Sequence, residues 1–259
     1  MSITSRSERL KGKVAVVTGA GAGIGKGCAL MFARHGAQVF ATDINAEWAQ
    51  ATLDEARQEG LDMDGLHPVD LTKPDDVQKL MDAAVARYGR IDVLVNAGAW
   101  GAFKWIEEMD YVKDWKRTLE CELDVVFLAC QAAWPHLKKQ GGSIVNFASA
   151  NAFVALEGSP ALAHCAGKGG VLAMTRQLAM EGGPYKIRAN SICPGMIVTA
   201  ATSPVLEQPG FIDNVLKKKM IKRVGQPEDI GYLAIYLASD ESSWVTAADI
   251  SVDGGATAW

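Results

Sequence analysis

Short apolar runs alternate along the chain with longer segments in which apolar residues recur every three to four positions. The short runs are nearly continuous and rich in β-branched residues, which is typical of strands buried on both faces of a parallel sheet. They predict seven strands, at 13–19, 38–43, 66–71, 91–98, 142–149, 187–195 and 249–255. The alternation of strands and helices predicts an α/β fold with a doubly wound parallel sheet covered by helices on both faces.

The helical segments carry boundary signals of their own. In residues 74–89, Pro74 suits the first helical turn and Gly89 suits the exit. Residues 197–214 form a long connection that we expect to be irregular, and connections of this length often cover a site. We therefore expect a flexible leader over residues 1–10 and a single domain over residues 11–259, with a substrate loop around 197–220.

Composition and charge exclude several classes of function. The chain has 259 residues, a net charge of −4 and one short basic cluster at 217–219, so we expect no nucleic-acid partner. No apolar run approaches the roughly 20 residues that cross a bilayer, which predicts no membrane span. The five cysteines have no spacing that suits a metal, and no secretory signal precedes the first strand. These features favour a metal-free protein in the cytoplasm.

A glycine-rich loop follows the first predicted strand. Residues 18–25, TGAGAGIG, lead directly into a helix, and such a loop lets backbone N–H groups approach a pyrophosphate. The spacing of Gly19, Gly23 and Gly25 is G-x-x-x-G-x-G rather than G-x-G-x-x-G. Tight turns between a strand and a helix also select glycine, so the loop alone leaves both explanations open.

An acidic residue ends the second predicted strand. Asp43 can accept hydrogen bonds from the hydroxyls of an adenosine ribose, and its carboxylate would repel a 2′-phosphate. No arginine follows at once in the sequence TDIN. These observations favour NAD over NADP as the cofactor. The alternative is that Asp43 only caps the next helix.

Several motifs in order resemble the short-chain dehydrogenases/reductases. They are TGAGAGIG, VDL at 69–71, NAG at 96–98, GSIVNFAS at 142–149, Lys168 in a helix, and PGMIVT at 194–199, so the resemblance covers residues 10 to 255. It implies a Rossmann-type NAD-binding domain, hydride transfer between NAD(H) and a secondary alcohol or ketone, and a homotetramer. The cofactor-binding residues that it implies are Gly19, Gly23, Ile24, Gly25, Asp43, Ile44, Asp70, Leu71, Asn96, Ala97, Gly98, Lys168, Pro194, Gly195, Ile197 and Thr199.

The resemblance is partial at the expected reaction centre. Ser149 fits the family's substrate-holding serine, and Lys168 fits the lysine of its Tyr-x-x-x-Lys motif. His164 occupies the tyrosine position, Glu122 occupies the position of the family's asparagine, and none of the five tyrosines stands in. The spacing of His164 and Lys168 places both on one helix face. The candidate catalytic residues are therefore Ser149, His164, Lys168 and Glu122.

Histidine can accept a proton at neutral pH without the help that tyrosine needs. Its reference pKa is about 6.5, against about 10 for tyrosine. Lys168 and a cationic nicotinamide should disfavour the imidazolium, which favours alcohol oxidation over carbonyl reduction, and we expect Glu122 to offset this by pairing with Lys168. The alternative is a catalytically inactive NAD-binding protein with a regulatory or scaffold function.

The sequence says less about the substrate. Aromatic and apolar residues after NAG and after the fifth strand either wall the substrate cleft or pack in the core or an interface; they are Trp100, Phe103, Trp105, Phe153 and Leu156. Glu122 and Glu157 can hydrogen-bond hydroxyl groups. We expect a small-molecule alcohol or carbonyl substrate, with sugars and polyols included.

Overall fold

A seven-stranded sheet forms the centre of the computed structural model, which describes residues 6–156 and 158–259. The strands are β1 Val14–Thr18, β2 Gln38–Thr42, β3 Met63–Gly65, β4 Val93–Asn96, β5 Gly142–Phe147, β6 Ile187–Pro194 and β7 Asp249–Val252. They pair in parallel in the order β3-β2-β1-β4-β5-β6-β7. This arrangement confirms the predicted doubly wound, Rossmann-type sheet.

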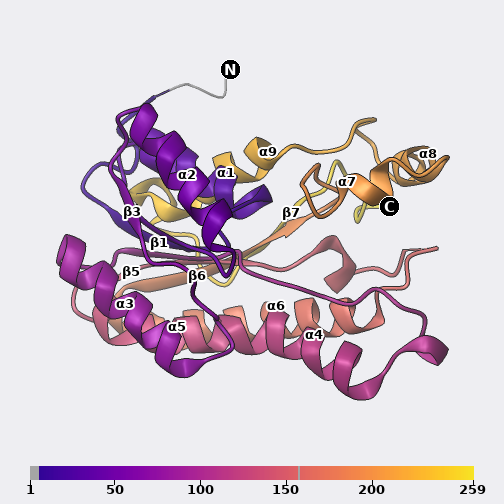
Figure 1. Cartoon of the computed structure of the whole chain (residues 1–259), viewed down its shortest axis with the longest axis horizontal. Helices are drawn as coiled ribbons and strands as arrows, with labels where there is room; N and C mark the ends of the chain where they lie inside the picture. Colours follow the sequence, from indigo (N-terminus) through magenta and orange to yellow (C-terminus); the bar gives the residue numbers. More distant parts are fainter. Residues whose placement is uncertain (1–5, 157) are drawn as a thin grey trace.

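Helices cover both faces of the sheet. One layer consists of α1 Gly23–Arg34, α2 Ala46–Gln58 and α9 Pro227–Ala238, and the other consists of α3 Pro74–Tyr88, α4 Arg117–Leu119, α5 Val125–Leu137 and α6 Leu162–Gly182 (Figure 1). Strand residues alternate between the layers, as strand geometry requires. In β4, Val93 and Val95 join the apolar cluster beneath α1 and α9, whereas Leu94 joins the cluster beneath α3, α5 and α6.

The third strand lies earlier than the sequence predicted. We expected it at 66–71, but β3 is the three-residue segment Met63–Gly65 at the edge of the sheet. Pro68 lacks the N–H that a ladder requires, which disfavours the predicted strand. Residues 66–71 instead cross the ends of the strands, where the Val69 N–H donates to the Asp43 carbonyl at 3.1 Å.

The helix before α5 is not a regular α-helix. The helical run contains π-helical turns at Tyr111–Lys116 and Glu120–Asp124, separated by α4. A π-turn inserts an extra residue and changes which side chains face inward, and such turns are frequent at functional sites. Glu122 lies in the second of these turns.

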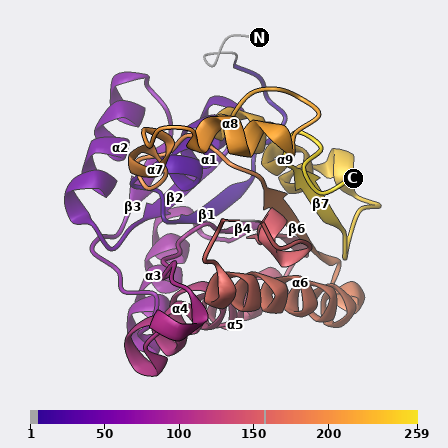
Figure 2. The ribbon, with the colours of Figure 1, turned by 90° about the vertical axis from the view of Figure 1, so that its right-hand side faces the viewer.

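The connection after β6 is partly helical rather than irregular. It contains α7 Ser203–Leu206 and α8 Phe211–Lys217, which lie together at one end of the molecule near the C-terminus (Figure 1). Figure 2 looks onto this end, where α7 and α8 lie across the sheet from α4 and α6. The segment that we expected to be the substrate loop therefore lies on one side of this end.

The described part of the leader packs against the domain. Leu10 is fully buried, and Arg9 forms an ion pair with Glu241 at 2.7 Å. These contacts hold residues 6–10 in place, although we expected the first ten residues to be loose; residues 1–5 lie outside the described part. Among the described residues, no helix has the length and apolarity that spanning a bilayer demands.

Candidate active site

The predicted site residues gather at the carboxyl ends of the strands. Gly19 follows β1, Asp43 follows β2, Ala97 follows β4 and Ser149 follows β5. The strand order places β1 beside β4, so the connections that leave these two strands run to opposite faces of the sheet. Open α/β sheets bind their ligands in the crevice at this point.

The three motif glycines of the loop are packed so closely that each leaves little or no room for a side chain. Gly19 has a φ of 64°, and a Cβ there would lie 2.6 Å from the Gly98 Cα. A Cβ on Gly25 would lie 2.0 Å from the Gly19 carbonyl oxygen, and one on Gly23 would lie 3.1 Å from Thr199 Cγ2. Bare backbone at the start of α1, with no acidic residue in its first turn, fits the pyrophosphate of a dinucleotide.

Thr18 joins the glycine loop to the loop after β4. Its hydroxyl accepts hydrogen bonds from the N–H groups of Ala97 and Gly98, both at 3.1 Å. We did not identify Thr18 from the sequence. Its position as the last residue of β1, directly before the glycines, was the available signal, because a buried hydroxyl there can satisfy the backbone of the neighbouring strand end.

The Asp43 carboxylate is held by backbone N–H groups. One oxygen accepts from Gly21 and the other from Asn45, both at 2.9 Å. Asn45, rather than Asp43, caps α2 by accepting from the Trp48 N–H at 3.0 Å. Asp43 is therefore not the helix cap that we had left open as the alternative. Ile44 next to it is 61% exposed.

Other predicted cofactor residues take structural positions around the crevice. Asp70 accepts from the Thr72 N–H and hydroxyl, and these bonds lower the pKa of its carboxyl. Leu71 lies against Gly98, where a Cβ would meet Leu71 Cδ1 at 2.8 Å. The Asn96 side chain points into the interior and donates to Asn146 Oδ1 at 2.8 Å. It therefore does not line the crevice, because the last residue of β4 faces the helix layer.

The segment after β6 lies against two other parts of the fold. A Cβ on Gly195 would lie 2.8 Å from the Asp253 Cα, so Pro194 and Gly195 lie against the end of β7. The Ile197 side chain is buried in the core cluster, as is part of Ile24. Thr199 stands over Gly23 and accepts from the Thr202 N–H at 3.2 Å. The connection thus contacts the glycine loop through Thr199, whereas the Ile197 side chain anchors the connection in the core.

The predicted proton-transfer residue has a carboxylate partner. His164 Nδ1 lies 2.6 Å from Glu122 Oε1, although 42 residues separate the two in the chain. Glu122 is 3% exposed and His164 is 16% exposed. We expected Glu122 to pair with Lys168, and this was wrong, since its hydrogen bond goes to His164. The π-turn at Glu120–Asp124 brings the carboxylate to this position.

Lys168 lies one turn further along the same helix face. It is buried, and its Nζ donates to the Phe147 carbonyl at 3.1 Å. Burial lowers the pKa of its ammonium group, and the nearby charge of Glu122 partly opposes that effect. The hydrogen bond ties α6 to the end of β5, two residues before Ser149.

Ser149 begins the short turn that follows β5. Its hydroxyl oxygen accepts from the Asn151 N–H at 3.1 Å, which leaves the hydroxyl proton for another acceptor. The turn at Ala150–Ala152 packs against α6, so Ser149 and His164 belong to adjoining segments. Within the part of the chain that the structure covers, no three His, Cys, Asp or Glu side chains group as metal ligands.

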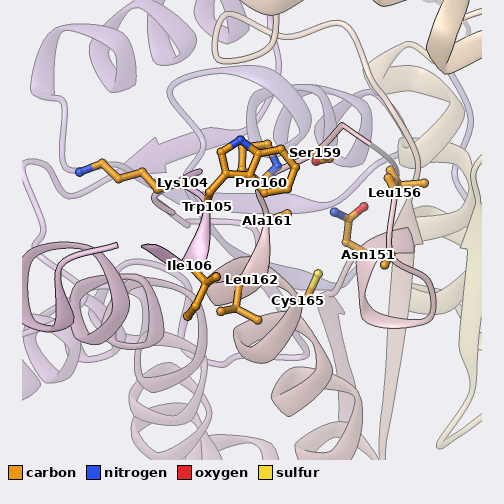
Figure 3. A pocket seen from close by; sticks show the side chains of 11 residues that line it. Lys104, Trp105, Ile106, Asn151, Leu156, Ser159, Pro160, Ala161, Leu162 and Cys165 are labelled. Atoms are coloured by element: carbon orange, nitrogen blue, oxygen red, sulfur yellow. The ribbon is translucent and has the colours of Figure 1, made fainter. Parts of the chain in front are cut away.

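An apolar pocket adjoins the start of α6. It has a volume of about 260 Å³ and is lined by Lys104, Trp105, Ile106, Asn151, Ala155, Leu156, Ser159, Pro160, Ala161, Leu162 and Cys165. Figure 3 shows these side chains around the start of α6, with the Lys104 ammonium pointing away from the others, toward Asp114 at 2.8 Å. Leu162 and Cys165, on either side of His164 in the sequence, line the pocket, but His164 does not.

The predicted aromatic walls divide between two positions. Trp105 and Leu156 line the pocket. The Phe103 ring instead packs on His164, with 5.2 Å between ring centroids. Trp100 and Phe153 are 50% and 45% exposed and line neither the core nor the pocket. Glu157, which we expected near the substrate, lies outside the described residues.

Comparisons with known proteins match nearly the whole chain. A family model described as enoyl-(acyl carrier protein) reductase matches residues 19–257. D-threitol dehydrogenase of Mycolicibacterium smegmatis is 39% identical over 254 residues, which are 96% of this chain and 94% of the relative. Meso-2,3-butanediol dehydrogenase of Serratia marcescens is 35% identical over 254 residues, 96% of each chain.

A solved structure extends the likeness to three dimensions. A 7α-hydroxysteroid dehydrogenase in complex with NADH and 7-oxo glycochenodeoxycholic acid superposes with a TM-score of 0.89 at 34% identity. The match covers 98% of this chain and 97% of that one. The relatives named above are oxidoreductases that act on alcohols. The fold, the glycine loop and these relatives lead to one assignment: the chain belongs to the short-chain dehydrogenase/reductase family.

Proposed function

We propose that this protein oxidises a secondary alcohol with NAD as hydride acceptor and with His164 as proton acceptor. The observation that carries the proposal is the position of His164, one turn before Lys168 and next to the segment of Ser149. These residues lie at the carboxyl ends of the strands, as the glycine loop does. A catalytic group must be within reach of the proton it takes. The proposal therefore relies on Ser149, His164 and Lys168 lying in adjoining segments.

Each of the three side chains has a separate task in the proposal. The Ser149 hydroxyl donates a hydrogen bond to the substrate oxygen, and His164 accepts the proton of the substrate's hydroxyl group. Lys168 keeps a positive charge beside the imidazole ring of His164. A bound nicotinamide supplies the hydride acceptor. The lowered pKa of Lys168 reflects a buried charge, which acts strongly because little water screens it.

The choice of NAD rests on Asp43. Its two oxygens already accept from backbone N–H groups, so the carboxylate is fixed at the end of β2. An ionised carboxylate at this place would accept ribose hydroxyls and repel a 2′-phosphate. One structural neighbour was solved with NADH, which supports the same choice.

For the substrate we propose a small secondary alcohol or polyol. Two relatives are named for threitol and for 2,3-butanediol, which carry more than one hydroxyl group. The pocket beside α6 is lined mainly by apolar side chains, with Trp105, Leu156 and Leu162 among them. Such a lining favours an alcohol with an apolar portion beside its reacting carbon.

We also propose that the protein works as a homotetramer in the cytoplasm. Phe127 on α5 and Met180 on α6 are 50% and 62% exposed, and Trp244 is 99% exposed. Large apolar side chains that a monomer leaves in water often belong to interfaces. All five cysteines are free thiols, which is typical of a reducing compartment.

The test is NADH formation by the wild type and by His164→Ala over a panel of secondary alcohols, alicyclic alcohols, sugars and polyols. We expect turnover in the wild type and a collapse of at least about 10²-fold in the variant. Turnover that survives unchanged in His164→Ala would remove His164 from the mechanism. If neither protein forms NADH from any alcohol although both bind NADH, the alternative of an inactive cofactor-binding protein is supported instead.

A further inference from the structure

Among the residues that the structure describes, only His164 hydrogen-bonds the buried Glu122 carboxylate. Oε1 pairs with His164 Nδ1 at 2.6 Å, and Oε2 has no hydrogen-bond partner among the described residues. Burying a charge with an unpaired oxygen is costly. An apolar side chain in this place would avoid that cost, so stability alone does not explain a carboxylate here.

Two glycines from different segments make the space for this carboxylate. A Cβ on Gly101, in the loop after β4, would lie 2.8 Å from Glu122 Oε1. A Cβ on Gly167, inside α6, would lie 2.8 Å from Glu122 Oε2. Glycine in a helix interior costs roughly 0.5–1 kcal/mol relative to alanine, so Gly167 is there against helix propensity. Both glycines fit the presence of a carboxylate between them.

The charged and titratable groups around His164 come from two elements. The π-turn supplies Glu122, and α6 supplies Lys168 one turn away and Cys165 next in the chain. The loop after β4 supplies the Phe103 ring, which is uncharged. Glu122 is thus the negatively charged group near both His164 and Lys168, and it accepts a hydrogen bond from the imidazole.

We propose that Glu122 is a positioning residue that keeps the Nδ1 of His164 protonated and leaves the Nε2 lone pair free for the substrate. A carboxylate is acceptor-only, so the proton of this hydrogen bond belongs to Nδ1. The hydrogen bond that one imidazole nitrogen makes decides which tautomer is present. Glu122 acts through His164 and does not touch the substrate.

The same contact balances charge when a proton moves. The substrate O–H bond breaks, its proton joins Nε2, and the alcohol carbon is oxidised as it loses a hydride to the nicotinamide. The imidazole is then a cation next to Lys168. Glu122 offsets that charge at 2.6 Å, much as a buried acid supports a histidine base in hydrolases. This step rests on the proposed function, whereas the tautomer does not.

The first experiment reads the tautomer without any turnover. Ring-nitrogen NMR at mildly alkaline pH distinguishes Nδ1–H from Nε2–H, and His164→Ala identifies the signals of His164 among the four histidines. We expect Nδ1–H in the wild type and in Glu122→Gln, whose amide oxygen still accepts. We expect Glu122→Leu to shift toward Nε2–H, the form that a free side chain prefers in water.

The second experiment separates positioning from folding. The kinetics use an alcohol that the wild type oxidises. The kcat of Glu122→Leu should fall about 10²-fold or more, and that of Glu122→Gln should fall by less. The affinity of both variants for NADH should stay the same. Glu120→Gln is the matched control, since Glu120 pairs with the partly exposed Arg117 at 2.6 Å, and it should change neither readout.

The outcomes keep the two proposals apart. Nε2–H in the wild type, or an unchanged tautomer in Glu122→Leu, would overturn the positioning role even if the enzyme is active. Nδ1–H in the wild type without turnover of any alcohol would leave the positioning role in place and refute the proposed function. A variant whose NADH affinity also collapses is misfolded, and Glu122→Gln then decides through its tautomer and kcat.

Discussion

Gly167 lies directly against the Glu122 carboxylate, so that a Cβ at position 167 would come within 2.8 Å of Oε2 and 3.2 Å of the Glu122 Cβ. Gly167→Ala should push the carboxylate away from His164. We expect at least about a tenfold loss of kcat, because a displaced carboxylate no longer fixes the His164 ring, and a misplacement of about 1 Å can cost roughly 10²-fold. Steady-state kinetics would measure it.

Gly169→Ala provides the control for that substitution. Nothing lies within 4 Å of a Cβ at position 169 of α6. Alanine there should raise stability by roughly 0.5–1 kcal/mol through helix propensity and leave kcat unchanged. Equal losses of activity in the two variants would refute the role assigned to Gly167.

Lys168→Met should stabilise the protein while it removes activity. Lys168 is buried with one hydrogen bond, and burial lowers its pKa from 10.5. The charged form therefore costs folding free energy at neutral pH, and an apolar replacement of similar length should gain about 1–3 kcal/mol. Thermal unfolding at neutral pH would measure the gain.

The pH dependence of that gain has a defined sign. The unfolded chain binds the Lys168 proton more tightly than the folded chain, so wild-type stability rises as pH passes from the lowered pKa toward 10.5. The advantage of Lys168→Met should thus be largest at neutral pH and shrink in alkaline solution. A gain that grows with pH would contradict a buried, charged lysine.

Thr18→Val should weaken both folding and cofactor binding. It leaves the Ala97 and Gly98 N–H groups without their acceptor, at a cost of about 1–3 kcal/mol. Calorimetry with NADH should show a weaker Kd. Thr175→Val removes the acceptor of a buried hydrogen bond that Asn146 Nδ2 donates at 2.9 Å, and it should lower stability with no change in Kd.

Asp43→Asn should reduce the preference for NAD over NADP. The amide keeps an acceptor oxygen for a backbone N–H but removes the charge that repels a 2′-phosphate. We expect the ratio of kcat/KM for the two cofactors to fall about tenfold or more, which corresponds to about 1.4 kcal/mol. Asp54→Asn, on the exposed face of α2 beside Arg57, should leave the ratio unchanged.

Local patterns in the sequence predicted most of the fold. The α3 helix runs from Pro74 to Tyr88 and ends at Gly89 with φ 79°, because both boundary signals are local. Six of the seven predicted strands overlap the observed ones, since buried runs of β-branched residues are distinctive. The edge strand β3 has the sequence MDG and only partly buried residues, so no such run marked it.

The site was predictable where it depends on spacing within one element. His164 and Lys168 share a face because they are four residues apart in α6. The partner of His164 was not predictable, because Glu122 is distant in the chain and sits in a π-turn whose register differs from that of an α-helix. Gly167 was a usable signal, since glycine inside a helix often marks a close approach.

The buried contact between Glu122 and His164 makes the two positions epistatic. Replacing His164 with the family's tyrosine alone would leave the Glu122 carboxylate buried with neither oxygen paired to an imidazole, and replacing Glu122 with asparagine alone would remove the charge that supports the ring. Converting the His–Glu site into the family's Tyr–Asn site therefore calls for both substitutions together. Gly101 and Gly167 leave room for the carboxylate that lies between them.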